Sequence, residues 1–333
     1  MTQENNSKAN IENSTFTPPH PLKTAVLFLV FNRLDTTKQV FQAIREAKPP
    51  RLYIAADGAR ESKEGEAEKV KAVRDYILQN IDWDCEVKTL FREQNFGCKM
   101  AVSSAITWFF ENEEMGIILE DDCLPSQSFF WFCEELLDRY KDEKKIFMIT
   151  GTSYLFNEIK SEDNYFFSKY MSIWGWCTWK DRWNNYDLNM SNFPEIKQKG
   201  LIDSYFHWDE NVKNIFMSYY EMAYGKKIDT WDFQWIYKCA EKNGLCLTPY
   251  LNLVSNIGIE GTRDGSDSPF INMQRQEIIL GDNKKIEISQ NFAIDKILFQ
   301  NVFYRFEKFV VIKGVLKKLK LYNFIKLIYK LFR

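Results

Sequence analysis

Residues 25–31 read AVLFLVF, and the polar pair Asn32 and Arg33 follows directly. A run this short and this uniformly apolar indicates a strand that is buried on both faces, which is typical of a parallel sheet. Similar runs recur, separated by segments that have the apolar spacing of helices. We therefore predict strands over 25–31, 51–57, 85–91, 116–119 and 146–150. Strands alternating with helices predict an α/β fold, with a mostly parallel central sheet and helices on both faces.

The segments between these runs predict the helices. Asp35 is placed to cap the first helix, and Pro49 and Pro50 should end it. Further helices are expected over 61–80, 97–112 and 127–140.

Composition limits the chemistry that the chain can perform. Lys and Arg number 44 and Asp and Glu 46, and a net charge of -2 argues against a nucleic-acid partner. Histidine occurs only at positions 20 and 207, which excludes a multi-histidine zinc site and disfavours a histidine-based nucleophilic mechanism. Acid–base and metal chemistry must therefore rest mainly on carboxylates, which prefer hard cations such as Mg²⁺ or Mn²⁺.

The cysteines and the first residues bear on the compartment. Seven scattered cysteines without a CxxC pair indicate buried single thiols in a reducing environment. Residues 1–22 are polar and lack the apolar core of a signal peptide, so we expect a disordered leader there. No apolar run approaches the length of a transmembrane helix. These features predict a cytoplasmic protein.

Polar residues follow several predicted strands at the edge where ligands bind in such sheets. Glu120, Asp121 and Asp122 come directly after one strand, and a divalent metal that bridges them to a diphosphate would relieve their repulsion. A solvated acidic turn that caps the next helix is the alternative. Arg33 could bind a phosphate and Asp57 a base or ribose, although a surface arginine and a turn aspartate before Gly58 would look the same.

Four segments together resemble a known family: LVFNR (29–33), LYIAADG (52–58), NFGCKMAVSSAITWFF (95–110) and IILEDDCLP (117–125). They are similar to a bacterial family of GT-A glycosyltransferases, related to the family 2 transferases and, more remotely, to N-acetylglucosaminyltransferase I. The resemblance covers about 24–265. It implies a GT-A (Rossmann-like) sheet, with a nucleotide-sugar-binding half over 23–150 and an acceptor-binding half over 151–285.

The resemblance also implies roles for individual residues. Asp122 would be the direct ligand of Mn²⁺ or Mg²⁺, with Asp121 and Glu120 near the ribose and the donor sugar. Asp57 would contact the uracil or its ribose, and Arg33 the pyrophosphate side of a UDP-sugar. The expected donor site is completed by Asn32, Gly58, Asn95, Lys99 and Arg263.

Arg263 lies in the Gly- and Ser-rich loop 255–269, at a place where relatives tend to carry a histidine after a threonine. The arginine could clamp the diphosphate directly, and the loop could close over the donor as a lid.

The segment TWDFQW (230–235) supplies the candidate base. An inverting transferase needs a carboxylate that takes the proton of the acceptor hydroxyl, and the apolar neighbours of Asp232 could raise its pKa toward that task. The resemblance places a base in this segment too, but the Gln-X-X-Arg-Trp signature of family 2 is absent. Glu221 and Asp229 are the substitutes, and a helix-start aspartate among core tryptophans is the alternative.

Tryptophans gather in the second half of the chain. Flat sugar faces pack on indole rings, so Trp174, Trp176 and Trp231 are candidate acceptor contacts. Trp176, Trp179 and Trp183 have the spacing of one helix face, however, and such a stripe is more often core.

Residues 286–333 are expected to form a helical, basic, amphipathic tail. Its part over 305–333 holds nine basic residues and one acid, with apolar stripes that change direction near 320. Two short amphipathic helices on an anionic membrane surface are predicted. The alternative is packing on the catalytic domain or on a second subunit, which would make a homodimer.

These features predict a metal-dependent, inverting hexosyl- or N-acetylhexosaminyltransferase. It would use a glycan or lipid-linked acceptor in surface polysaccharide synthesis, on the cytoplasmic face of the inner membrane. A sugar-phosphate nucleotidyltransferase would usually show a Gly-rich basic loop after the first strand, where this chain has FNRLD (31–35). A non-catalytic adaptor that binds glycan or membrane is the remaining alternative.

Overall fold

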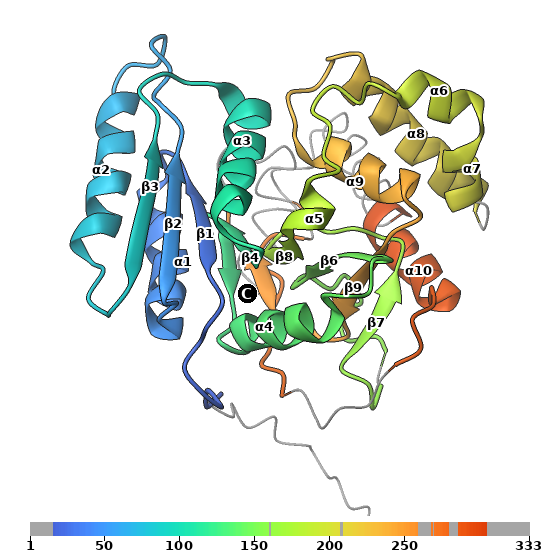
Figure 1. Cartoon of the computed structure of the whole chain (residues 1–333), viewed down its shortest axis with the longest axis horizontal. Helices are drawn as coiled ribbons and strands as arrows, with labels where there is room; N and C mark the ends of the chain where they lie inside the picture. The colour runs from blue at the N-terminus through green and yellow to red at the C-terminus, as the bar shows by residue number, and fades with distance from the viewer. Residues whose placement is uncertain are drawn as a thin grey trace, which may run out of the picture.

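The computed structural model describes residues 16–159, 161–206, 209–258, 268, 270–279 and 286–304. The order of strands in its central sheet is β3-β2-β1-β4-β8-β6-β9-β7 (Figure 1). The strands are β1 (Val26–Val30), β2 (Arg51–Ala56), β3 (Glu86–Phe91), β4 (Met115–Glu120), β6 (Ile146–Thr150), β7 (Tyr165–Ser168), β8 (Trp176–Trp179) and β9 (Leu245–Pro249).

Most strands of this sheet are parallel. β1 pairs in parallel with β2 and β4, and β6 does so with β9, whereas β8 is antiparallel to both of its neighbours and β7 is antiparallel to β9. The predicted α/β class with a mostly parallel central sheet is confirmed. Because β8 is inserted between β4 and β6, one sheet runs through both halves of the chain.

Helices cover both faces of the sheet. They are α1 (Leu34–Ala47), α2 (Glu66–Gln79), α3 (Gly97–Asn112), α4 (Ser128–Tyr140), α5 (Lys180–Trp183), α6 (Phe193–Gln198), α7 (Leu201–Tyr205), α8 (Glu210–Tyr224), α9 (Asp232–Glu241) and α10 (Phe292–Phe299), followed by a π-helical turn (Gln300–Tyr304). Side chains alternate along β1: Phe28 packs with α1 and α4, whereas Leu27 and Leu29 pack with α3 and the helices of the second half. Figure 1 shows α4 on one side of the middle of the sheet, and α5 and α9 on the other.

Four details of the sequence prediction are wrong. Asp35 lies inside the first turn of α1, and Arg33 is the residue at the cap. The helix expected over 61–80 begins only at Glu66. Residues 176–179 form a strand, so the tryptophan spacing that resembles a helix face spans β8 and then α5.

The fourth error concerns the leader. Among its described residues, Phe16 packs on the ring of Trp131 in α4, at 5.4 Å between ring centroids, and Leu22 is buried. The indole Nε1 of Trp131 also donates to the carbonyl oxygen of His20 (2.8 Å). Residues 16–22 therefore belong to the packed domain.

No helix in the described part of the chain combines the length and the apolarity needed to cross a bilayer.

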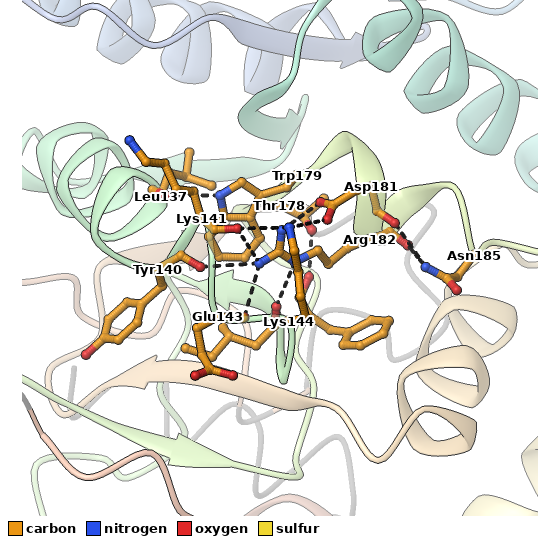
Figure 2. Close-up of polar contacts among 12 residues, drawn as sticks. Leu137, Tyr140, Lys141, Glu143, Lys144, Thr178, Trp179, Asp181, Arg182 and Asn185 are labelled. Carbon is orange, nitrogen blue, oxygen red and sulfur yellow. Dashed lines mark hydrogen bonds and ion pairs between the residues drawn. The ribbon is translucent and has the colours of Figure 1, made fainter.

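Arg182 joins the end of α4 to the second half of the chain. Its side chain is buried, and its Nη2 donates to the carbonyl oxygens of Tyr140, Lys141 and Glu143 at 3.3, 2.9 and 3.1 Å (Figure 2). The guanidinium lies 4.3 Å from the ring centroid of Trp179. Because the last carbonyls of a helix have no partner within the helix, Arg182 satisfies groups that would otherwise be buried and unpaired.

Arg182→Met is expected to lower the free energy of unfolding by about 2–3 kcal/mol, because it strands several buried carbonyls. Urea denaturation measures the change. Lys144→Met is the control, since Lys144 forms an exposed ion pair with Asp181 (2.6 Å), and its loss should cost below about 1 kcal/mol. An Arg182 variant that is as stable as this control would contradict the assigned role.

Candidate functional site

The polar residues that follow β1 and β4 meet at one edge of the sheet. The parallel register places Leu29 opposite Glu120, so Arg33 lies beside the acidic triplet. Nη1 of Arg33 is 2.9 Å from Oδ2 of Asp122, and Nη2 and Nε of Arg33 reach the two oxygens of Asp121. Asp121 and Asp122 are buried. Here the arginine that was predicted to bind a phosphate balances two carboxylates.

Arg33 contacts two of the three carboxylates, and the third, Glu120, has the most strongly raised pKa. Burial, followed by the charges of Asp122 and Asp121, raises the pKa of Glu120 to about 8. The negative charge of Asp232 makes a smaller contribution to the same rise. Burial likewise raises the pKa of Asp121 to about 6, with the charge of Arg33 opposing it. The site therefore lacks positive charge.

The raised pKa of Glu120 predicts a pH-dependent stability. An unfolded glutamate titrates near 4.5 and this one near 8, so the folded state holds the proton between these values and loses stability as the pH rises through them. Glu120→Gln carries no such charge. The free energy of unfolding of this variant minus that of the native chain should be about 1–2 kcal/mol larger at about pH 9 than at about pH 5. The difference is smaller than the full pKa shift would give, because Glu120 is partly exposed and solvent screens its charge. Denaturant titrations at the two pH values measure this, and parallel profiles would contradict the shift.

Asp57, at the end of β2, organises the loop that leads into α3. Its carboxylate accepts hydrogen bonds from the backbone amides of Phe96 (3.0 Å) and Gly97 (3.1 Å). Asn95 Nδ2 donates to the carbonyl oxygen of Gly58 (2.7 Å). A Cβ at Gly58 would lie 2.4 Å from the backbone of Gln94, so only glycine fits there. The structure thus gives this group a loop-holding role, and its contact with a base or ribose stays a prediction.

Asn32 connects β1 to the start of α2. Its Nδ2 donates to Oε1 of Glu66 (2.9 Å), and Glu66 is also bonded to the guanidinium of Arg60. The hydrogen bond from Arg60 is the main reason that the pKa of Glu66 falls to about 2. Nothing in the sequence pattern pointed to Glu66, which orients the loop beside Arg33.

The two substitutes for Asp232 have other partners. Oδ1 of Asp229 accepts from the backbone amide of Lys99 (3.3 Å), at the first turn of α3. Glu221, on α8, forms an ion pair with Lys197 on the surface. Asp232 is the first residue of α9 and is partly exposed. The charge of Asp232 is among those that raise the pKa of Glu120.

Two of the three candidate acceptor tryptophans lie in the core. Trp176 and Trp231 are 1% and 2% exposed and stack on one another, with ring centroids 5.8 Å apart and planes at 19°. Their faces are taken by neighbouring side chains, so neither offers a sugar platform in this structure. Trp174 is only partly buried, and it is the candidate whose exposure still suits an acceptor contact.

A short ribbon brings the second half of the chain onto the triplet. β5 (Cys123–Pro125) pairs antiparallel with β10 (Val254–Asn256), and the amide of Ile257 donates to the carbonyl oxygen of Asp122 (2.8 Å). A Cβ on Gly258 would lie 2.4 Å from Oδ2 of Asp122 and 3.0 Å from Nη1 of Arg33. Gly258 therefore covers the ion pair, a role that sequence reasoning missed. Arg263, with most of the loop that was predicted to form a lid, lies outside the described residues, as does the tail beyond 304.

The side chains of the acidic triplet offer the kind of ligand atom that a hard divalent cation prefers. They offer carboxylate oxygens only, and Arg33 is paired with two of the three acids, Asp121 and Asp122. Within the described residues, no three His, Cys, Asp or Glu side chains are arranged to hold a metal ion by themselves. Further ligands would therefore have to come from a bound diphosphate and water, around Asp122.

No protein-family model matches the chain, and no curated protein matches it. Among solved structures, the mannosyltransferase PcManGT from Pyrobaculum calidifontis, in complex with GDP-Man and Mn²⁺, is similar at 9% identity and a TM-score of 0.32, over 49% of this chain and 46% of that one. HddC from Yersinia pseudotuberculosis is similar at 9% identity and a TM-score of 0.26, over 38% and 57%. An apo UDP-glucose pyrophosphorylase is similar at 10% identity and a TM-score of 0.32, over 69% and 93%.

The chain thus spans about half the length of the first two of these structures. Likeness at these TM-scores bears on neither activity nor ligand, and the fold assignment rests on the strand order of this chain.

Proposed function

We propose that this protein is an inverting glycosyltransferase that moves a hexosyl or N-acetylhexosaminyl group from a UDP-sugar to a glycan or lipid-linked acceptor. One observation carries the proposal. The acidic triplet and Arg33 meet at the ends of β1 and β4, and the charge of Asp232, at the start of α9, is one of those that raise the pKa of Glu120. The reaction needs a donor site and a base, and these two groups of carboxylates are our candidates for them.

Each group has a task in this reaction. Arg33 can turn a guanidinium N–H from Asp122 to a donor phosphate while Asp121 holds the remainder of the fork. A divalent cation bound through Asp122 would supply positive charge for the departing diphosphate. Asp232 takes the proton from the acceptor hydroxyl while the oxygen of that hydroxyl forms the bond to the anomeric carbon. The bond from that carbon to the nucleoside diphosphate breaks on the opposite face, and this single displacement inverts the configuration at the carbon.

The structure offers less for a nucleotidyltransferase. β1 ends at Val30 and α1 begins at Leu34, which leaves three residues, none of them glycine, between them. A Gly-rich loop that cradles a triphosphate has no room there. A non-catalytic adaptor, in turn, would need neither the carboxylate cluster nor Asp232 near it.

A panel of UDP-glucose, UDP-galactose, UDP-N-acetylglucosamine and GDP-mannose tests the proposal. With Mn²⁺ present, slow release of a nucleoside diphosphate from at least one donor is expected, accelerated by a suitable acceptor. Formation of a nucleoside triphosphate after addition of pyrophosphate would instead identify a nucleotidyltransferase. An absence of either product across the panel would favour the adaptor.

We also propose that the enzyme works on the cytoplasmic face of the inner membrane in surface polysaccharide synthesis, with residues 305–333 as the contact to anionic lipid. The basic residues of that segment motivate the idea. Full-length protein should float with anionic vesicles, and a triple Lys317→Glu, Lys318→Glu, Lys320→Glu variant should not. Equal flotation of both would contradict the membrane role and leave a contact between subunits as the alternative.

A further inference from the structure

We infer that Tyr186 is a positioning residue for Asp232, acting through the backbone carbonyl of Trp231; this inference rests on the proposed function. The hydroxyl of Tyr186 donates to that carbonyl oxygen at 3.2 Å. Trp231 immediately precedes Asp232, and no side chain caps the first turn of α9 from that position. The Trp231–Asp232 peptide is therefore held at its carbonyl by Tyr186, while the carboxylate of Asp232 accepts a hydrogen bond from the amide of Phe233 (2.9 Å) in the same turn.

Tyr186 is itself fixed from the donor half. Its ring stacks on that of Trp183, with centroids 4.4 Å apart and planes at 12°. Nε1 of Trp183 donates to Oγ1 of Thr107 on α3 at 3.0 Å. A chain of contacts thus runs from α3 through Trp183 and Tyr186 to the carbonyl before Asp232.

The surroundings of the Tyr186 hydroxyl keep it a donor. Ser103 of α3 and the carboxylate of Asp232 are among its neighbours, and burial raises the pKa of Tyr186 well above its ordinary value. The hydroxyl therefore keeps its proton in the neutral range and can donate to the carbonyl of Trp231.

The indole ring of Trp231 is also held in place, in addition to its carbonyl group. It stacks on Trp176, which is paired with Ile118 of β4, two residues before Glu120. Trp231 is thus held by its ring to the strand that carries the acidic triplet and by its carbonyl to Tyr186. Farther back, Asp229 ties the start of this segment to the amide of Lys99. The backbone immediately before Asp232 is thus held from both halves of the chain.

Tyr186→Phe tests the inference, because it removes the hydroxyl and keeps the stacked ring. Turnover is followed as nucleoside diphosphate released from the most active donor of the panel, with Mn²⁺. We expect kcat to fall on the order of tenfold, with donor KM and the affinity for UDP changed less than about twofold, since misplacing a reacting group affects the chemical step. In a plot of rate against pH, the midpoint of the acidic limb should be unchanged, because the same carboxylate still acts as the base.

Tyr205→Phe is the matched control. The hydroxyl of Tyr205 lies within hydrogen-bond distance of the carbonyl oxygens of Gly244 (2.9 Å) and Lys169 (3.2 Å), which lie outside the site. This variant should lose stability and keep kcat within about twofold.

Three outcomes would overturn the inference. If Tyr186→Phe keeps full kcat while Asp232→Asn is inactive, Tyr186 does not position the base and the proposed function stands. If Tyr205→Phe lowers kcat as much as Tyr186→Phe, the effect is general loss of structure. If Asp232→Asn is fully active, the proposed base fails, and the positioning role fails with it.

Discussion

Asp232→Asn is expected to lower the turnover of donor and acceptor by about 10³-fold, the range that loss of a general base produces. The amide has nearly the shape of the carboxylate but cannot take the proton from the acceptor hydroxyl. Affinity for UDP should stay within about twofold, because the proposed role of Asp232 is toward the acceptor and not the nucleotide. Initial rates measured across pH should also lose their acidic limb, which in the native enzyme reports protonation of the base.

The two other carboxylates near α9 provide matched controls. Glu221→Gln removes a surface ion pair with Lys197 and should leave turnover unchanged. Asp229→Asn weakens a contact with the amide of Lys99 and should cost less than about tenfold. Full activity of Asp232→Asn together with an inactive Asp229→Asn would move the base to Asp229.

Asp122→Asn is expected to lower turnover by about 10³-fold, and to remove the dependence of UDP binding on Mn²⁺. The amide is a weak ligand for a hard cation, while Asp121 still holds the guanidinium of Arg33. The variant should melt at no lower temperature than the native chain, because it removes one charge from a cluster that has too many. Inactivity with intact folding would then locate the defect in the site.

Asp82→Asn is the control for this substitution. Asp82 also bonds to an arginine, Arg45, but on the protein surface. It should keep full turnover and full response to Mn²⁺. If Asp122→Asn were as active as Asp82→Asn, the metal assignment would be wrong.

The parts of the fold that depend on local pattern could be predicted from the sequence. Apolar runs such as 25–31 became buried parallel strands because nothing but a core accommodates them. The meeting of Arg33 with Asp121 and Asp122 followed from the rule that the carboxyl ends of parallel strands share an edge.

The parts that depend on contacts distant in the sequence could not be predicted. Spacing alone made Trp176 and Trp183 look like one helix face, because it does not reveal that β8 enters the sheet between β4 and β6. Asp57 turned out to hold the amides of Phe96 and Gly97, a pairing set by how β2 and α3 pack. Gly258 reaches Asp122 only through the β5–β10 ribbon, which has no sequence signature.

Calorimetric titration of UDP into the full-length protein, with Mn²⁺ and then with EDTA in its place, tests the central claim most directly. The claim is that Arg33 and the triplet at the ends of β1 and β4 form a metal-assisted nucleotide-diphosphate site. We predict saturable binding with Mn²⁺ that weakens at least about tenfold with EDTA, since the cation would carry much of the charge complementarity to the diphosphate. Absence of binding in both conditions, or equal binding in both, would contradict the account.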